Sequence, residues 1–408
     1  YFNFFNQSNT RSYIITFLAS MIIWGSRYIY DQFIGINYSS EDYYIWNKII
    51  SYAQLSTFIP LTSSFQSGLP KVIAFKKIKN NNSISNILNS LLFILCISVV
   101  FFLLISLFLK SNDNVFFVSI YSLLVFCGLL IFQTTQATLR SFLNFNYTLL
   151  YSFSFSVFLI ISYISLPSTI YSVSFSLFLA YLLASFTVII GLFFFRNEKP
   201  IFTLPELTKR SLALGKTVYF AGLMAILIIE GDKYIVSLLP NSLNSASYLY
   251  FRNSSLVTFL FASIISSTFY PIILNKVQGR AKNIIGYILK VEKYLLLLSI
   301  ILFFFSTPIL LFTLIYLNVP YLDNLSILPV FTLTSIPAGL IHIYLCSVVS
   351  FDLEASLTRK IIPIIIFQFV FMTLIYNYFS IYLFAIFHLS FVLFFMFFIR
   401  RYLFLNIS

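Results

Sequence analysis

The residues that could do chemistry lie inside apolar segments of the sequence. Glu230, Asp232 and Lys233 interrupt the apolar run that extends from Ser211 to Leu239. An ionisable side chain within a bilayer costs several kcal/mol unless it faces a wet cavity or a partner. Each of these three residues is therefore a candidate for binding a substrate or a coupling ion.

Further charges occur in two other apolar runs. Arg27 and Asp31 are four positions apart, so they share one face of a helix. Arg252 lies near the start of a run that begins at Ser245. We expect six side chains to line a polar cleft: Arg27, Asp31, Glu230, Asp232, Lys233 and Arg252. The alternative is that these charges cancel in local pairs that hold two halves of the protein together.

Other reactive residue types give no site. Cys96, Cys127 and Cys346 each lie in an apolar run without the spacing of a metal or redox motif. His342 and His388 are single histidines in separate segments, and two lone histidines do not make a zinc site. We expect no catalytic residues, no metal and no cofactor, and we expect His342 to be structural.

The elements that position the charged residues are membrane helices. The sequence is 60% hydrophobic and only 9% charged, with a mean hydropathy of +0.94, whereas soluble domains carry about 25% charged residues. A spanning helix needs roughly 20 apolar residues. This predicts an all-α polytopic membrane protein with about twelve helices: 13–35, 44–68, 84–109, 115–139, 145–166, 170–195, 211–239, 245–274, 289–317, 325–350, 360–378 and 380–399. Five prolines are expected inside them: Pro60, Pro308, Pro329, Pro337 and Pro363.

An internal duplication organises these helices. Asp31 precedes Asp232 by 201 positions (232 − 31), and the same offset relates four identical pairs: Leu55 to Leu256, Thr57 to Thr258, Phe58 to Phe259 and Pro70 to Pro271. Repeats of six helices each are parallel, with a site at their interface. We expect an N-terminal half at 1–196, a linker at 197–210, a C-terminal half at 211–408, and a cleft between the two repeats.

The basic residues indicate the orientation. The net charge of +13 comes mostly from lysines and arginines in alternate loops, which is typical of membrane topology and not of nucleic acid binding. This bias predicts a multi-pass protein of the bacterial cytoplasmic membrane with both termini in the cytoplasm. Basic residues near the inner leaflet would also attract anionic lipid headgroups.

Several motifs resemble a known family. Asp232-Lys233 late in the seventh helix, Tyr248-Leu-Tyr-Phe-Arg252 opening the eighth, Pro271 at its inner end and Gln136-Ala-Thr-Leu-Arg140 ending the fourth are similar to polysaccharide-transport flippases. These belong to the multidrug/oligosaccharidyl-lipid/polysaccharide (MOP) exporter superfamily, and the likeness is nearest to the Wzx type, which flips O-antigen or capsule repeat units.

The resemblance implies a substrate and a mechanism. It implies that an undecaprenyl-pyrophosphate-linked oligosaccharide moves from the inner to the outer leaflet by alternating access, driven by an H⁺ or Na⁺ gradient. It also implies polysaccharide polymerase machinery as a partner. Arg27 and Arg252 would contact pyrophosphate or acidic sugars, and Asp31, Glu230 and Asp232 would bind coupling ions or sugar hydroxyls.

Three other functions compete with this one. A multidrug or small-cation exporter of the same superfamily would share the fold and use Asp31 and Asp232 for drug and proton. An O-antigen polymerase or ligase would be an enzyme, but it needs a long outward loop, and the outward loops expected here are short. A major-facilitator sugar carrier would have an acid among the basic residues of 68–82, where this chain has lysines alone. We therefore expect a transporter and not an enzyme.

Overall fold

A computed structural model describes most of the chain. The described residues are 7–56, 113–141, 145–197, 222–237, 243–255, 284–319, 321–376 and 380–407, together with a few residues between 84 and 100 and residues 273, 276 and 277. All statements about structure below concern these residues.

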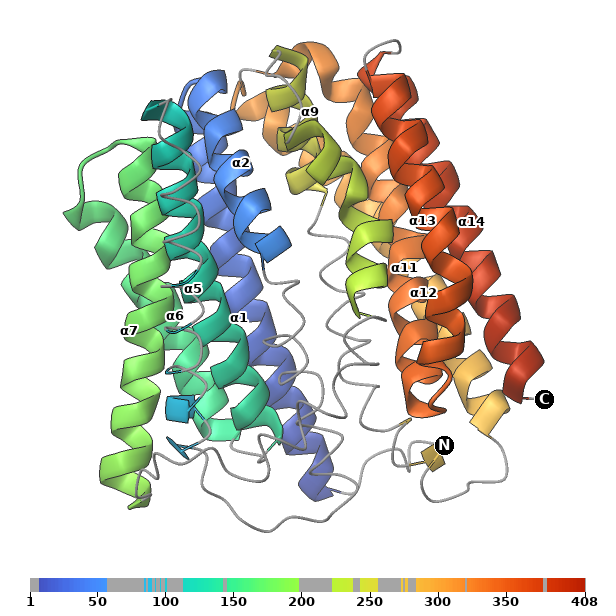
Figure 1. Ribbon diagram of the computed structural model, residues 1–408, viewed down its shortest axis with the longest axis horizontal. Coiled ribbons are helices and arrows are strands. Elements are labelled where there is room, and N and C mark those ends of the chain that lie inside the picture. Colours follow the sequence, from blue (N-terminus) through green and yellow to red (C-terminus); the bar gives the residue numbers. More distant parts are fainter. Residues whose placement is uncertain are drawn as a thin grey trace. The chain divides into compact units, whose positions relative to one another are not determined.

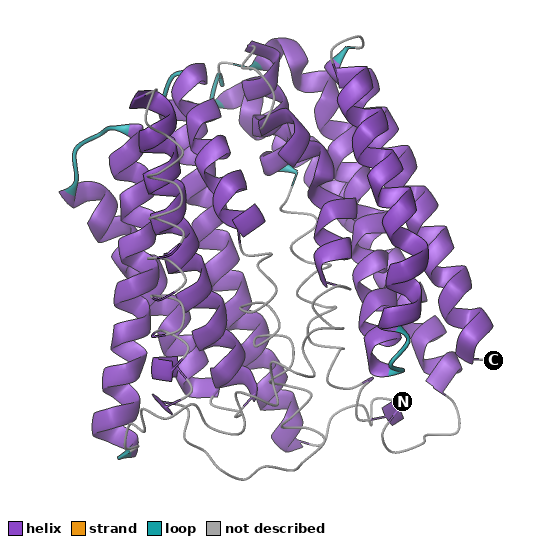
Figure 2. Cartoon of the chain, in the orientation of Figure 1, coloured by secondary structure: helices purple, strands orange, loops and turns teal. Residues whose placement is uncertain are grey.

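The described residues are almost entirely helical and include no strand (Figures 1 and 2). The helices are α1 (Gln7–Asn37), α2 (Ser40–Ser56), α5 (Asp113–Ser141), α6 (Phe145–Ser165), α7 (Ile170–Arg196), the helical segment 222–237, α9 (Leu243–Ser254), α11 (Ile284–Tyr316), the 3₁₀ helix η1 (Leu322–Ile327), α12 (Leu328–Ser350), α13 (Glu354–Tyr376) and α14 (Ile381–Ile407). Among the described residues, seven helices are long and apolar enough to cross a membrane. The expected all-α, polytopic membrane fold is confirmed.

Local sequence explains where several helices begin and bend. Thr169 caps α7, because its hydroxyl accepts a hydrogen bond from the backbone N–H of Ser172, and Asn197 ends the helix in the left-handed conformation with φ 51°. Pro308, Pro337 and Pro363 lie inside α11, α12 and α13, as expected.

Pro329 does not lie in a helix interior. It occupies the first turn of α12, since the preceding residues form η1 and α12 begins at Leu328. Proline is tolerated there because the first backbone N–H groups of a helix have no partner within it. Pro60 lies outside the described residues.

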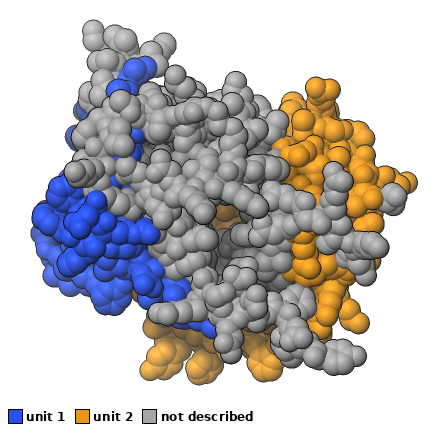
Figure 3. Space-filling model, turned by 90° about the horizontal axis from the view of Figure 1, so that it is seen from below, with its two compact units in different colours: residues 1–27, 45–219 blue, residues 28–44, 220–408 orange. Residues whose placement is uncertain are grey.

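The chain forms two compact units (Figure 3). The first comprises Tyr1–Arg27 and Ile45–Tyr219, and the second comprises Tyr28–Tyr44 and Phe220–Ser408. Most of the expected linker, from 198 onward, lies outside the described residues, as do Thr57, Phe58 and Pro70 and their partners in the C-terminal half.

The first unit is built around α5, α6 and α7. Phe132 and Tyr181 place their ring centroids 4.9 Å apart, and Phe155 stacks on Tyr181 at 5.0 Å. The buried hydroxyl groups of Tyr151 and Ser185 are hydrogen-bonded to each other, with 3.2 Å between Oη and Oγ. This core therefore combines aromatic packing with neutral hydrogen bonds.

The second unit buries a larger aliphatic core between segment 222–237 and α11 to α14. Its members include Ile228, Ile288, Ile341, Ile361 and Phe395, all fully enclosed. These residues hold segment 222–237 against α14, and α9 also contacts α12. Segment 222–237, α9 and α14 carry the candidate site.

Candidate functional site

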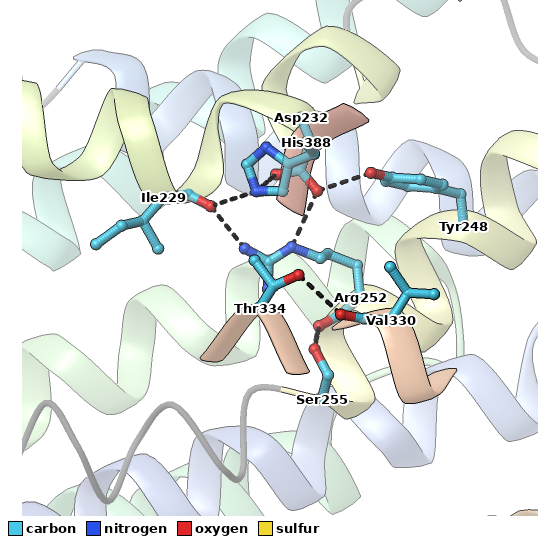
Figure 4. Close-up of polar contacts among 8 residues, drawn as sticks. All are labelled: Ile229, Asp232, Tyr248, Arg252, Ser255, Val330, Thr334 and His388. Carbon is cyan, nitrogen blue, oxygen red and sulfur yellow. Dashed lines mark hydrogen bonds and ion pairs between the residues drawn. The ribbon is translucent and has the colours of Figure 1, made fainter. Parts of the chain in front are cut away.

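Three elements of the second unit bring a polar cluster together (Figure 4). Asp232 comes from segment 222–237, Tyr248 and Arg252 from α9, and His388 from α14. Tyr248 and Arg252 are four residues apart, so they project from one face of α9 toward the same carboxylate. We call Asp232, Tyr248, Arg252 and His388 the Asp232 cluster.

The carboxylate of Asp232 is the centre of the cluster. Its Oδ2 accepts a hydrogen bond from Arg252 Nε at 3.0 Å and another from Tyr248 Oη at 2.8 Å. Asp232 is fully buried, and Arg252 is only 4% exposed. A carboxylate removed from water requires such a counter-charge, because desolvation of an isolated ion costs several kcal/mol.

His388 and Arg252 share two acceptors. Arg252 Nη2 donates to the carbonyl oxygen of Ile229 at 2.7 Å, and His388 Nε2 lies 3.0 Å from the same oxygen. His388 Nε2 is also 3.3 Å from Asp232 Oδ1. A carbonyl oxygen can only accept, so the short contact with Ile229 assigns the imidazole proton to Nε2.

Aromatic side chains isolate the cluster from water. The guanidinium of Arg252 lies 5.8 Å from the ring centroid of Phe331, and the ring of Tyr248 packs edge-on against Phe331 and Phe384. Within this enclosure Asp232 Oδ1 and His388 Nδ1 are buried and make no hydrogen bond to the residues that the structure describes. Asp232 Oδ1 still has the His388 ring beside it at 3.3 Å, whereas His388 Nδ1 is an acceptor with no hydrogen bond from a described residue.

The cluster does not resemble a metal centre. Across the described ranges, no three His, Cys, Asp or Glu side chains gather as metal ligands would. What the geometry permits is competition: a cation arriving at Asp232 would displace Arg252, and an anion arriving at Arg252 would displace Asp232.

The structure brings some of the six predicted site residues together. Asp232 and Arg252 are in direct contact, and Glu230 lies within electrostatic range of Arg252 on the half-buried side of the same segment. Lys233 is also buried, at 6% exposure. The pairing of Asp232 with Arg252 corresponds to the alternative of local charge compensation for that pair.

Arg27 and Asp31 lie on opposite sides of the division between the units. Arg27 belongs to the first unit, where its guanidinium lies 5.9 Å from the ring centroid of Trp24. Asp31 belongs to the second unit and accepts a hydrogen bond from Tyr43 Oη at 3.1 Å. Both side chains are half-buried.

His388 is the member of the cluster that sequence reasoning missed. It stands alone in an apolar run, so the sequence gives no sign of a partner for it. The available signal was indirect: buried Asp232 needs polar partners, and His388 is one of few polar side chains in the final helix.

Comparison with known proteins rests on structure. No protein-family model matches the sequence, and no curated protein matches it. Solved structures do match, over nearly the whole chain.

Three solved structures illustrate the likeness. An inward-facing multidrug resistance MATE family transporter of the MOP superfamily matches with a TM-score of 0.67 and 14% identity, covering 96% of this chain and 98% of that one. An outward-facing one matches with a TM-score of 0.65 and 12% identity over 96% and 95%. A MOP superfamily transporter from Pyrococcus furiosus, described as having a binding pocket of reverse polarity that suggests a different function, matches at 0.64 and 13% over 96% and 95%.

These likenesses establish the fold. The chain has the fold of these solved transporters over 96% of its length, and seven helices of its described part are long and apolar enough to cross a membrane. At this level of identity the comparison leaves the substrate open.

Proposed function

We propose that this chain is a secondary transporter of the MOP type that exports a small molecule by alternating access. The observation that supports this most is the fold match over 96% of the chain to both an inward-facing and an outward-facing MATE transporter. Two of the three solved structures described above are multidrug resistance transporters, so they favour small-molecule export over the flippase expected from sequence motifs.

The Asp232 cluster is the proposed coupling site. A proton or Na⁺ that binds the carboxylate of Asp232 competes with Arg252, which lies 3.0 Å away. When the ion is bound to Asp232, Arg252 has lost its counter-charge and can bind another acceptor. Binding of the ion at Asp232 therefore controls whether Arg252 is free to bind a substrate. Glu230, Lys233, Arg27 and Asp31 are the further residues that we propose line the route.

A lipid-linked oligosaccharide is the second candidate substrate, and one observation favours it. The charge of Asp232 is already compensated by Arg252, and the phenol of Tyr248 donates a hydrogen bond to it. The carboxylate is therefore not available to bind a cationic drug. A pyrophosphate or an acidic sugar could instead take Arg252, since guanidinium groups bind phosphate oxygens in pairs.

One experiment separates the two substrates. Cells that lack the protein are compared with cells in which it is restored, and both dye efflux and the leaflet distribution of polyprenyl-pyrophosphate-linked oligosaccharide are measured. Small-molecule export predicts that restoration increases efflux and leaves the lipid-linked sugars unchanged. Accumulation of these sugars on the cytoplasmic leaflet, cleared on restoration, would replace the first candidate with the second.

The role of Asp232 is tested in the same cells with Asp232→Asn. The proposal predicts that transport per molecule of protein in the membrane is lost. The amount of protein in the membrane is measured alongside, because the substitution leaves buried Arg252 without its counter-charge. Glu41→Gln is the matched control, because it also removes one acid but at an exposed position. Normal transport by Asp232→Asn would remove this residue from the coupling site.

The cellular location is also proposed. We infer from the distribution of basic residues that the protein lies in a bacterial cytoplasmic membrane with both termini in the cytoplasm. A reporter that is active only in the cytoplasm, fused after Ser408, should be active; an inactive reporter on a fusion protein of normal abundance would reverse the orientation.

A further inference from the structure

A stretch of the N-terminal half of the sequence packs within the second compact unit. Residues Tyr28–Tyr44, the end of α1 and the start of α2, group with Phe220–Ser408. The 201-residue duplication would place this stretch with the N-terminal repeat. We call Tyr28–Tyr44 the hairpin segment, and its contacts within the second unit explain the grouping.

Three hydrogen bonds attach the hairpin segment to α9. Tyr28 Oη donates to the backbone oxygen of Ser254 at 3.2 Å, and Ser254 Oγ donates to Gln32 Oε1 at 2.9 Å. Asn253 Nδ2 donates to Tyr43 Oη at 3.0 Å, and Tyr43 Oη in turn donates to Asp31 Oδ2 at 3.1 Å. These bonds connect neutral groups at every step except the last.

Helix 222–237 supplies one more attachment. Tyr44 Oη donates to the backbone oxygen of Ser237 at 3.3 Å. Tyr43 and Tyr44 are both buried, so the start of α2 is held against the two elements that also carry Asp232 and Arg252.

Three tyrosine rings pack at the centre of this attachment. The ring centroid of Tyr250 lies 5.8 Å from that of Tyr43 and 5.0 Å from that of Tyr321. Gly35 permits the close approach of α1, because a Cβ added there would lie 2.5 Å from the ring of Tyr250. The contact between α1 and the ring of Tyr250 therefore requires a residue without a side chain at position 35.

The attached state also leaves polar groups unsatisfied. The hydroxyls of Tyr250 and Tyr321 and the amide nitrogen of Gln32 are buried without a hydrogen bond to any residue in the described ranges. Burial raises the pKa of Tyr321 to about 12, so its phenol stays neutral at physiological pH. A buried polar group without a partner has lost its hydration without compensation, and each of these groups regains water if the segment lifts away.

We propose that the hairpin segment is a releasable latch that covers one face of α9 and opens during the working cycle. Favourable contacts hold it, and the three unsatisfied groups oppose them, which lowers the free-energy cost of release. The latch deepens the proposed transport function, which requires part of the fold to separate and rejoin in each cycle. Its existence is tested by accessibility and does not require a known substrate.

Ser247 provides the reporter position. It precedes Tyr250 and Ser254 by three and seven residues, so it lies on the same stripe of α9, and it is only 2% exposed. Its hydroxyl makes no hydrogen bond to a described residue, so Ser247→Cys is nearly isosteric and breaks no described contact. Cys96, Cys127 and Cys346 are first replaced with alanine.

The measurement is the rate at which a water-soluble maleimide labels Ser247→Cys in the purified full-length protein. If labelling proceeds through opening of the latch, its rate follows the open population. Tyr43→Phe removes the bonds to Asn253 and Asp31 and should raise the rate about tenfold, since about 1.4 kcal/mol corresponds to a factor of ten. Tyr28→Phe removes a single bond and should raise it about threefold.

Two controls make the result specific. Tyr147→Phe removes one comparable bond, to the Gly191 carbonyl at 3.3 Å, but in the first unit, and it should leave the rate unchanged. Ser380→Cys is exposed and should label rapidly in every background. An unchanged rate in both Tyr43→Phe and Tyr28→Phe would overturn the latch, as would an equal increase in Tyr147→Phe, which would indicate general loosening. Either failure leaves the dye-efflux test of transport standing.

Discussion

Two acids related by the 201-residue offset have different surroundings. Asp232 is fully buried and is held by the guanidinium of Arg252, with Tyr248 and His388 beside it. Asp31 is half-buried and accepts a hydrogen bond from the phenol of Tyr43. A carboxylate in a dry site requires a full counter-charge, whereas partial hydration lowers that requirement.

The positions equivalent to the partners of Asp232 show the same contrast. Subtracting 201 from Arg252 and Tyr248 gives Ser51 and Asn47, both buried on α2. The N-terminal repeat therefore places small neutral groups where the C-terminal repeat places a cation and a phenol. This asymmetry is the reason for assigning coupling to the Asp232 cluster and a reversible contact to the Asp31 region.

The largest expected effect comes from removing the counter-charge. Arg252→Met leaves the carboxylate of Asp232 buried without its cation and should lower the free energy of unfolding by about 3–5 kcal/mol. The measurement is thermal or denaturant unfolding of the detergent-solubilised protein. Adding Asp232→Asn to Arg252→Met should recover part of the loss, because it removes the uncompensated charge. If the double variant is as unstable as the single one, charge compensation is not the function of Arg252.

A smaller effect is expected from the phenol of the same cluster. Tyr248→Phe keeps the ring packing against Phe331 and Phe384 and removes the hydrogen bond to Asp232, so it should cost about 2 kcal/mol, within the range for bonds to charged groups. Tyr151→Phe in the first unit is the matched comparison, since it removes a neutral hydroxyl contact with Ser185 and should cost about 1 kcal/mol. Equal losses would contradict the claim that Tyr248 donates its hydrogen bond to a charged carboxylate.

The glycine of the hairpin segment that faces Tyr250 gives an effect of about 1 kcal/mol. Gly35→Ala inserts a methyl group against Tyr250, and overpacking costs about 1–3 kcal/mol, offset in part by the better helix propensity of alanine. Gly25→Ala is the control, because a Cβ there meets no atom within 4 Å; it should be neutral or slightly stabilising. A stabilising Gly35→Ala would mean that the tyrosine packing is loose.

The smallest effect is expected at the second acid. Asp31→Asn preserves the size of the side chain and keeps an acceptor for Tyr43, so the loss in unfolding free energy should be under about 1 kcal/mol. Unfolding is measured as for Arg252→Met. A loss as large as that of Arg252→Met would show that Asp31 is as dependent on its partners as Asp232. It would contradict the contrast between the two acids.

Much of the fold follows from the sequence because a helix that spans a lipid bilayer must be a long apolar run, which hydropathy detects directly. Long apolar runs with charges between them predict helices that span a membrane, and the observed α7 (Ile170–Arg196) matches the expected 170–195 closely. Pro329 was misplaced because a 3₁₀ turn precedes α12, and apolar runs do not distinguish such a turn from a longer helix.

The candidate site could be predicted only in part. Asp232 and Arg252 stand out because charge in an apolar run needs an explanation, yet they are 20 residues apart on different helices, and periodicity gives no relation between helices. His388 contacts Asp232 from 156 residues away in the chain (388 − 232). The grouping of Tyr28–Tyr44 with the second unit depends likewise on tertiary contacts, which helix-length and charge patterns do not encode.

The most direct test of the central claim is transport by the purified protein in sealed proteoliposomes. With an imposed H⁺ or Na⁺ gradient, a fluorescent organic cation should be moved across the membrane, and an ionophore that collapses the gradient should stop it; Asp232→Asn of normal abundance should be inactive. If the folded protein moves no small molecule under either gradient but does move polyprenyl-pyrophosphate-linked oligosaccharide between leaflets, small-molecule export is wrong and the flippase takes its place. If it moves neither, the chain is not the transporter that we propose.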